Sequence, residues 1–473
     1  MRNTRPILAW ETLLDLEAER SDARRPLRDR VEAALRLAID EGRLSAGAAV
    51  PPSRTLAETL GVSRWVVTEA YGQLVAEGVL EARTGSATRV AEQAGGAPVR
   101  TPPVPRSVAL LTAPPTRFDL RPGIPDLRAT PRSRWSAALR TAVAELPDHD
   151  LAAAHPHGYA PARDAVAAYL SRSRHAVADA TRITITHGAT DGMGMLAREL
   201  HHRGHRAILV EDPSWPRLRA VADDNGLRSI PVPVDGDGID TGQLRALASA
   251  TGARAALVTP AHQFPLGAAL APVRREELVR WAREHDALVI EDDYDAEFRY
   301  DRRPVPALQR LAPDRVALIG SLSKSVSPAL GLGWMLLPPD VAPPASTAPP
   351  SLIDQAALAE FLTRGDLERH LRSSRTRFRR RRQRLLDALE RALPELTVTG
   401  IAAGMHLVLP LPPGASATQI AAAGTAIGLA LTPLARYEAG DRHPESLVLG
   451  YGNLDDALVE EAVLRLAALL GGR

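Results

Sequence analysis

The chain contains a single lysine, whose amine can do chemistry that an arginine cannot. Of its 58 lysine and arginine residues, 57 are arginine and only Lys324 is lysine. A primary amine attacks a carbonyl to form an imine, whereas a guanidinium stays protonated and does not. A chain that otherwise uses arginine as its cation therefore keeps a lysine where the amine itself is required. The alternative is chance survival at a surface position, and the residues around Lys324 must decide between the two.

The residues before Lys324 include the groups that a lysine-bound pyridoxal phosphate needs. Such a cofactor requires a carboxylate that keeps its pyridine nitrogen protonated, a phenol at its ring oxygen, donors for its phosphate and an aromatic side chain over its ring. The segment EDDYD supplies Asp292 for the nitrogen and Tyr294 for the ring oxygen. Lys324 follows an apolar run within GSLSK, so its amine can project from the end of a strand. We predict one site from these three residues.

Phosphate donors are available at two places in the sequence. Gly188, Ala189 and Thr190 open a helix after RITITH, where free backbone N–H groups and the helix dipole favour an anion. Ser321 and Ser323 add hydroxyl groups beside the lysine. Together these residues predict a phosphate-binding corner next to Lys324.

Two further residues complete the predicted site. Trp215 in EDPSWPR is placed to stack on the cofactor ring, and Gln263 in TPAHQFP can donate to the ring oxygen. Each signal alone is open to another interpretation, because EDDYD is also compatible with a cation site or a loop, and a tryptophan is more often a core residue. The order of the motifs along the chain favours the cofactor site.

The motifs need a scaffold, and the sequence predicts an α/β domain. Short apolar runs (RITITHG, RAILVEDP, AALVTPAH, ALVIEDDYD and VALIGSLSK) alternate with helical segments near 190–203, 215–225 and 273–285. This alternation predicts a mostly parallel sheet covered by helices. In such sheets ligands bind at the carboxyl ends of the strands. Five motifs follow the apolar runs and are predicted to meet there: GATDG, EDPSWPR, TPAHQFP, EDDYD and GSLSK.

A long helix from about residue 366 leads into a smaller C-terminal α+β lobe. Its apolar residues recur on one face, which predicts that the following turn inward: Leu367, Leu371, Phe378, Leu385 and Leu389. The arginines between them fit either a solvated helix face or a nucleic-acid patch, and we favour the solvated face.

The first ninety residues predict a winged helix-turn-helix. An amphipathic helix over 27–42 precedes two periodic segments in SRTLAETLGVSRWVVTEAYGQLVAEGVL, for which Ser53 and Ser63 are candidate N-caps. EARTGSATRV then predicts two short strands around a glycine-containing turn. The alternative is a helical bundle with exposed arginines, but the order of elements favours the winged helix.

Such a motif binds double-stranded DNA through the start of its second helix, the start of the preceding helix and the tip of the wing. In that order, the predicted DNA-binding residues are Ser63, Arg64, Trp65 and Thr68; Ser53 and Arg54; and Arg83, Thr84, Gly85 and Ser86. Arg64 can contact a guanine or a phosphate.

Composition limits the remaining possibilities. Residues 92–116 are rich in proline, alanine and glycine and predict a linker between a domain over 1–91 and another over 117–473. The net charge is only +2, so a nucleic-acid role must come from local arrangement. There is no cysteine and no HExxH spacing, which argues against a metal site. We see no secretory signal or membrane span, and expect a cytoplasmic protein.

The N-terminal motif resembles a known family. PPSRTLAETLGVSRWVVTEAYGQLVAEGVL is similar to the winged-helix domain of GntR-type bacterial regulators over about residues 27–91. Trp65 replaces the small polar residue common after the Ser-Arg pair, and Ala87 stands where the wing usually carries a second glycine. Both departures leave the operator sequence open.

The remainder resembles the fold type I aminotransferase module of MocR regulators. GATDG, EDPSWPR, TPAHQFPLG, EDDYDAEFRY and GSLSKSVSPALGLGWM occur in the order of that module. The resemblance implies a domain-swapped head-to-tail homodimer in which pyridoxal 5'-phosphate and an amino compound alter the two winged helices. It assigns Lys324 to the cofactor imine, Asp292 and Tyr294 to the ring, Trp215 to stacking and Arg217 to a ligand carboxylate.

Two positions depart from the family pattern. Gly331 stands seven residues after the lysine, where the family usually has an arginine that holds the phosphate. Loss of this charge-assisted contact should weaken cofactor binding by about 1.5–3 kcal/mol unless another cation substitutes. Val448 replaces the arginine with which aminotransferases hold the α-carboxylate, a role for which Arg436 is the candidate substitute.

We therefore predict a pyridoxal phosphate-dependent transcription regulator that responds to an amino acid, an amine or a vitamin B6 vitamer. In this family the aminotransferase fold senses ligand and does not ordinarily turn over efficiently. One alternative is an active aminotransferase with an accessory winged helix. Another is a DNA-binding protein with a degenerate, cofactor-free module.

Overall fold

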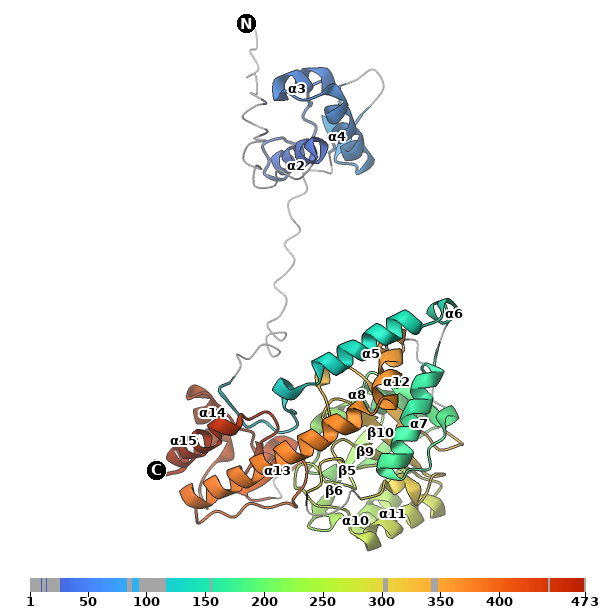
Figure 1. Ribbon diagram of the computed structural model, residues 1–473, viewed down its shortest axis with the longest axis vertical. Coiled ribbons are helices and arrows are strands. Elements are labelled where there is room, and N and C mark those ends of the chain that lie inside the picture. The colour runs from blue at the N-terminus through green and yellow to red at the C-terminus, as the bar shows by residue number, and fades with distance from the viewer. Residues whose placement is uncertain are drawn as a thin grey trace. The chain divides into compact units, whose positions relative to one another are not determined.

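The computed structural model describes residues 10, 14, 26–82, 87–92, 116–153, 155–300, 305–341, 348–440 and 443–471. The chain divides into two compact units, Met1–Thr112 and Ala113–Arg473 (Figure 1). The predicted wing tip, Arg83 to Ser86, lies outside the described residues, as do residues 93–115 of the predicted linker.

The first unit is a winged helix-turn-helix, as predicted. Its elements are α2 (Leu27–Asp40), α3 (Ser53–Leu60), α4 (Arg64–Ala76) and the antiparallel pair β1 (Leu80–Glu81) and β2 (Arg89–Val90). Each helix contributes to one apolar core, which includes the fully buried Leu35, Leu56, Val67 and Leu74.

The caps of α3 and α4 differ. Ser63 caps α4, since its Oγ accepts a hydrogen bond from the Val66 amide at 3.4 Å. Ser53 does not cap α3: Pro52 occupies the N-cap and Ser53 is the first helical residue. Pro52 has φ of −54° and ψ of 142°, the extended conformation from which a helix starts. The predicted capping role of Ser53 is therefore wrong.

The second unit is built on an eight-stranded sheet in which most neighbours run parallel, as predicted. Its order is β4-β11-β10-β9-β8-β5-β6-β7, with β11 antiparallel to both neighbours and β7 antiparallel to β6. The strands are β4 (Ile183–Thr186), β5 (Ala207–Asp212), β6 (Arg228–Asp235), β7 (Gly238–Ile239), β8 (Ala255–Val258), β9 (Leu288–Asp293), β10 (Val316–Ser321) and β11 (Gly333–Leu336).

Helices cover both faces of this sheet, which explains why its strands are continuous apolar runs. On one face α8 (Ala189–His202) and α9 (Pro216–Asp224) pack on alternate strand residues such as Val210 and Ile290. On the other face α10 (Thr241–Thr251) and α11 (Pro272–Glu284) pack on Leu209 and Val289. The helices α5 (Arg132–Glu145), α7 (Ala160–Arg174) and α12 (Leu352–Thr363) complete the main body.

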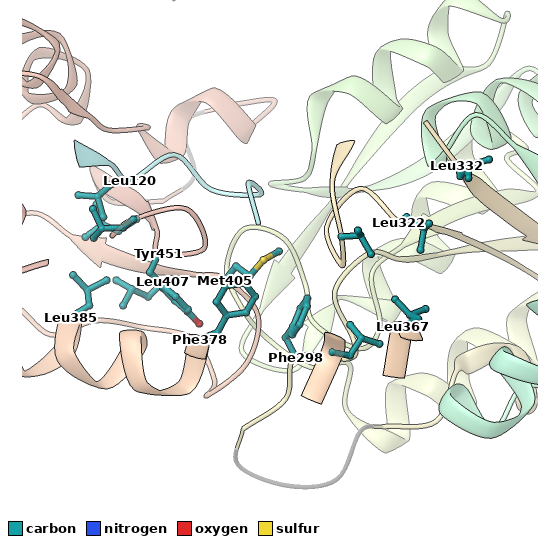
Figure 2. Close-up of a cluster of buried hydrophobic side chains, with 14 of the residues drawn as sticks. Leu120, Phe298, Leu322, Leu332, Leu367, Phe378, Leu385, Met405, Leu407 and Tyr451 are labelled. Carbon is teal, nitrogen blue, oxygen red and sulfur yellow. The ribbon is translucent and has the colours of Figure 1, made fainter. Parts of the chain in front are cut away.

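The helix α13 (Asp366–Ala392) joins the main body to the C-terminal lobe. The lobe contains α14 (Ala417–Ala426), α15 (Val459–Gly471), the antiparallel pair β12 (His406–Pro410) and β14 (Ser446–Gly450), and β13 (Leu429–Ala430) beside β3 (Phe118–Asp119). One hydrophobic cluster runs along α13 from the lobe to the main body (Figure 2). Within it the rings of Phe298 and Phe378 lie 5.1 Å apart, edge to face.

The five apolar residues predicted to turn inward on α13 are all buried. Most of the arginines between them are exposed, in keeping with a solvated face. Arg381 is different: it is 3% exposed, and its guanidinium binds the carboxylates of Asp126 and Asp456 and the carbonyls of Tyr451 and Gly452. Burial of this arginine is compensated because most of its donors meet an acceptor.

Candidate cofactor and effector site

A cavity of about 230 Å³ lies where the predicted motifs meet at the carboxyl ends of the strands. Loops after β4, β5, β8, β9 and β10 contribute to its wall, because their strands run in the same direction through the sheet. The lining residues are Gly123, His187, Gly188, Ala189, Thr190, Trp215, Arg217, Leu218, Thr259, Phe264, Asp292, Tyr294, Ser321, Ser323, Lys324 and Pro328. The cavity therefore brings together ten of the twelve predicted cofactor and effector residues.

Lys324 extends from the end of β10 into this cavity. Its Nζ donates a hydrogen bond to the carbonyl of Gly123 at 2.7 Å and lies 5.3 Å from the centre of the Trp215 ring. Burial lowers the pKa of the Lys324 amine, and the carboxylates of Asp292 and Asp295 oppose this effect. A lowered pKa increases the fraction of free amine, which is the nucleophilic form.

Asp292 follows the buried part of β9 and faces the same cavity. Burial, aided by the charge of Asp293, raises the pKa of Asp292 to about 7, although Lys324 acts in the opposite direction. The Oδ1 atom of Asp292 is buried and makes no hydrogen bond to any described residue. Such an acceptor is costly to leave unpaired, and a cationic N–H donor would satisfy it.

The predicted phosphate corner forms at the N-terminus of α8. Gly188 is the N-cap with φ of 113°, a conformation that favours glycine, and Ala189 and Thr190 begin the helix. Gly333 on β11 packs so closely that a Cβ there would lie 2.6 Å from the Gly188 Cα. Ser323 is also adjacent, since its Oγ would lie 4.0 Å from a Cβ on Gly188.

Trp215 belongs to an aromatic wall beside the cavity. Its ring stacks on Tyr437 at 6.3 Å and meets Phe264 edge to face at 5.8 Å. The indole remains 38% exposed, so one of its surfaces is open to a ligand. Val448 is fully buried and packs with Phe264 and Tyr437, behind the wall and not in the cavity.

Two predicted residues do not line the cavity. Gln263 is 1% exposed; its Nε2 donates to the carbonyls of Pro213 and Phe264 and its Oε1 accepts from the Leu266 amide. The amide is thus committed to holding loops, and the predicted contact with a ring oxygen is corrected. Arg436 is exposed on the 3-10 helix Leu434–Tyr437, and the structure gives no support for its predicted effector role.

Gly331 lies in an open position and shows no substitute contact. Its φ is 56°, and a Cβ built there would meet no atom within 4 Å. Among the described residues that line the cavity, the exposed Arg217 is the permanent cation, and Lys324 is the amine predicted to bind the cofactor. Weaker cofactor binding, caused by Gly331 in place of a phosphate-binding arginine, therefore remains a prediction. Arg217 is the other cation among the described residues that line the cavity.

The sequence interpretation missed several residues around the cavity. Gly123, Thr259 and His187 line it, and His262 and Asp295 lie directly behind Tyr294. Most of these belong to motifs that the sequence interpretation had already singled out, but their contacts depend on which strands are neighbours. Gly123 comes from a segment with no such motif.

The predicted DNA-binding residues of the helices lie at the start of α4 and α3. Arg64 and Trp65 are exposed in the first turn of α4, and Trp65 is 65% exposed. Thr68 is exposed but its hydroxyl donates to the Arg64 carbonyl at 2.9 Å. On α3 the exposed Arg54 forms a 3.1 Å ion pair with Glu58, which is also exposed.

Comparison with known proteins identifies both units. The family model described as aminotransferase class I and II matches residues 128–466, and the model described as bacterial regulatory proteins, gntR family, matches residues 27–90. Pyrococcus horikoshii kynurenine aminotransferase has a similar structure, with a TM-score of 0.67 and 22% identity over 77% of this chain and 93% of that chain. The chain therefore belongs to the aminotransferase class I and II family and carries a gntR-family domain.

Full-length relatives define the type of protein more closely. The chain is 34% identical over 430 residues to the HTH-type pyridoxine biosynthesis transcriptional regulator PdxR of Corynebacterium glutamicum, covering 89% of this chain and 91% of that protein. It is 31% identical over 469 residues to the probable rhizopine catabolism regulatory protein MocR of Rhizobium meliloti, covering 93% of each. The chain is a helix-turn-helix transcription regulator of this MocR type, with an aminotransferase-like domain. No helix among the described residues is long and apolar enough to cross a membrane.

Proposed function

We propose that pyridoxal phosphate binds in the cavity through Lys324 and that its occupancy, with an amino compound or another B6 vitamer, controls DNA binding. The observation that carries this proposal is that Lys324 and Asp292 line the same cavity and interact electrostatically. A lysine with a lowered pKa lies beside a buried carboxylate oxygen that has no partner among the described residues. These are the groups that a pyridinium ring attached to an amine needs.

The other residues at the cavity fit the same ligand. Trp215 offers an open aromatic face, Tyr294 a phenol, and Ala189 and Thr190 the free amides of a helix N-terminus. Pyridoxal phosphate supplies an aldehyde that condenses with amines and a ring that withdraws electrons from the attached carbon. Arg217 at the cavity mouth can bind the carboxylate of an amino compound.

Gly331 bears on how firmly the cofactor is held. Without a cation at this position, the phosphate depends on backbone amides and on the hydroxyls of Thr190, Ser321 and Ser323. Neutral donors bind a phosphate more weakly than a guanidinium does. We therefore propose that the cofactor exchanges with solution and that its concentration is part of the signal.

We assign residues 1–91 to the DNA-binding domain, 92–116 to the linker and 117–473 to the effector domain. The division of the chain between Thr112 and Ala113 supports this assignment. We also propose that a domain-swapped homodimer presents two winged helices to a double-stranded operator. Sedimentation equilibrium of the full chain, with and without operator DNA, tests the oligomeric state.

Borohydride reduction tests the cofactor directly. Protein incubated with pyridoxal phosphate should absorb visible light, and reduction should leave an adduct on Lys324 because the chain has no other lysine side chain. Lys324→Ala should abolish the adduct and the absorbance. Wild-type protein without visible absorbance, or with unchanged absorbance in Lys324→Ala, would contradict the proposal and favour a cofactor-free module.

A second candidate function is aminotransferase turnover, which the presence of Lys324, Asp292 and Tyr294 in one cavity favours. Val448 argues against it, because a buried valine replaces the arginine that would hold an α-carboxylate. Transamination at ordinary enzyme rates without any effect of amino acids on promoter binding would favour the enzyme. Ligand-dependent promoter binding with negligible turnover supports the regulator.

A further inference from the structure

Behind Tyr294 lies a buried polar cluster that consists of His262, Asp295 and His406. The three side chains are 3%, 2% and 5% exposed, and His262 and Asp295 come from the loops after the neighbouring strands β8 and β9. The Nδ1 atom of His262 lies 2.8 Å from Asp295 Oδ2 and 3.0 Å from the Tyr294 hydroxyl. The cluster thus touches the cavity through one phenol.

The cluster also has the composition of a metal site, since one potential ligand atom from each residue lies within 4.8 Å of the others. Two ligands of one zinc ion lie about 3.3 Å apart when each is about 2.0 Å from the metal in tetrahedral geometry. The His262 and Asp295 atoms are only 2.8 Å apart, which is the distance of a direct charge-assisted hydrogen bond. The geometry therefore favours a hydrogen-bonded pair.

The hydrogen-bond directions follow from the chemistry of the pair. A carboxylate only accepts, so the proton of the pair lies on His262 Nδ1. His262 Nδ1 lies within hydrogen-bonding distance of both Asp295 Oδ2 and the Tyr294 oxygen, so both oxygens can accept from the same N–H. Burial and nearby carboxylates raise the pKa of Tyr294 well above its ordinary value, so the phenol keeps its own hydrogen. The hydroxyl lies 3.0 Å from His262 Nδ1, and the carboxylate of Asp295 is the acceptor with which a ligand oxygen in the cavity would compete for the phenol's hydrogen.

The surroundings hold the pair in place. Gly404 has φ of 67°, and a Cβ there would lie 2.6 Å from the Asp295 carboxylate and would also collide with the His262 ring. The Gly404 carbonyl is fixed by hydrogen bonds from the hydroxyls of Tyr300 and Tyr451. The neighbouring His406 ring is uncharged, because burial lowers its pKa to about 3, and it bonds to the Pro265 carbonyl at 3.0 Å. The other carboxylates that act on Tyr294 are those of Asp292 and Glu211.

We propose that His262 and Asp295 are positioning residues that orient the Tyr294 phenol as a hydrogen-bond donor to the ring oxygen of the ligand. The inference rests on the proposed function, which supplies the ring. A donor to that oxygen stabilises its ionised form and keeps the corresponding titration at lower pH. The pH midpoint of the visible absorbance of bound cofactor therefore reports on the pair, while a purely structural role would not move it.

Two substitutions at His262 provide matched test variants. The amide nitrogen of His262→Asn can occupy the position of Nδ1, whereas that of His262→Gln lies near the position of Nε2. We expect Tyr294→Phe to raise the absorbance midpoint by about one pH unit, as loss of one hydrogen bond to a charged group does. His262→Gln should raise it by at least half as much, and His262→Asn should stay close to wild type.

A double-mutant cycle gives the decisive comparison. In a Tyr294→Phe background His262→Gln should cause no further shift, because the pair acts through the phenol. Equal midpoints in His262→Gln and wild type would overturn the inference, as would a shift that persists without the phenol. If His262→Gln does not fold, Asp295→Asn is used in its place, with the same expected direction and the same cycle.

Other outcomes separate this inference from the proposed function. Wild-type protein that shows no visible absorbance with pyridoxal phosphate would contradict both. Normal absorbance with unshifted variants would contradict the positioning role alone. Stoichiometric zinc in the purified protein, lost on His406→Ala, would overturn the hydrogen-bonded arrangement.

Discussion

The two units of the chain present the side chains proposed for their functions in opposite environments. On α4 Arg64 and Trp65 face solvent, whereas Asp292 and Lys324 lie in a cavity where burial shifts both pKa values. An exposed arginine keeps its charge and is screened by salt, whereas a buried carboxyl or amine responds to every neighbouring charge. DNA binding should therefore depend strongly on salt concentration and little on pH. Ligand binding in the cavity should depend strongly on pH and little on salt concentration.

The largest expected effect is on the unfolding free energy of the second unit, which contains the cavity, and Asp292→Asn tests it. The pKa of Asp292 in the folded protein, about 7, lies above that of an unfolded aspartate. The folded state thus binds the extra proton between roughly pH 4 and 7, and the unfolding free energy falls as the pH rises through this window. Because asparagine does not ionise, the unfolding free energy of Asp292→Asn at pH 8 should exceed that of wild type by about 2–4 kcal/mol.

Denaturant unfolding at pH 5 and pH 8, without cofactor, measures this difference. The exposed Asp224→Asn serves as the matched control and should leave the pH dependence as it is in wild type. An equal pH dependence in Asp292→Asn and wild type would show that desolvation does not set the chemistry of the cavity.

The DNA-binding end should respond to charge removal and salt. Arg64→Ala should weaken operator binding by about 2 kcal/mol and, if the contact is to a phosphate, reduce the slope of log affinity against log salt by about one. Gel-shift titrations at two salt concentrations measure both quantities. Arg28→Ala on α2 is the control, because Arg28 is exposed but lies outside the predicted recognition turn. Equal losses in the two variants would refute the assignment of α4.

Gly331→Arg should strengthen cofactor binding by restoring a cation near the phosphate corner. The expected gain in binding free energy is about 1.5–3 kcal/mol, whereas the strain of a non-glycine residue at positive φ is present with and without cofactor and lowers the unfolding free energy. We expect at least roughly tenfold tighter binding in an absorbance titration, since a factor of ten corresponds to about 1.4 kcal/mol. Gly331→Ala is the control, because it carries the strain without the charge. If Gly331→Arg bound the cofactor no more tightly than Gly331→Ala, the prediction that an arginine at this position would bind the phosphate would be wrong.

The smallest effect is expected at the cap of α4. Ser63→Ala removes the hydrogen bond to the Val66 amide and should destabilise the first unit by about 1 kcal/mol. Thermal unfolding of the full chain should show a lower transition temperature for the first unit and an unchanged transition temperature for the second unit. Ser45→Ala, an exposed serine outside the helices, should leave both transitions in place.

The sequence predicted features that arise locally and missed those that depend on strand order. Apolar runs ending in polar motifs located five strands and the corner at Gly188, because a buried strand and a helix start have local signatures. β6 was not predicted, since Pro231 and Pro233 interrupt its pattern. The amide of Gln263 was assigned to the ligand because the carbonyls that accept from it come together only in the fold.

The pairing of His262 with Asp295 shows the same limit. Both residues belong to predicted strand-end motifs, but only the adjacency of β8 and β9 brings their side chains together. Arg381 was assigned to a solvated face for a similar reason. Its partners Asp126 and Asp456 are far away in sequence, and helical periodicity does not report them.

The short strand β3 has a mechanical consequence. Phe118 and Asp119, which follow the linker, pair with Leu429 and Ala430 in the C-terminal lobe and not with the main sheet. The Asn453 side chain of the lobe also donates to Asp119. If the lobe moves relative to the main sheet, β3 must therefore move with the lobe. The end of the linker that leads from the winged helix would then move as well.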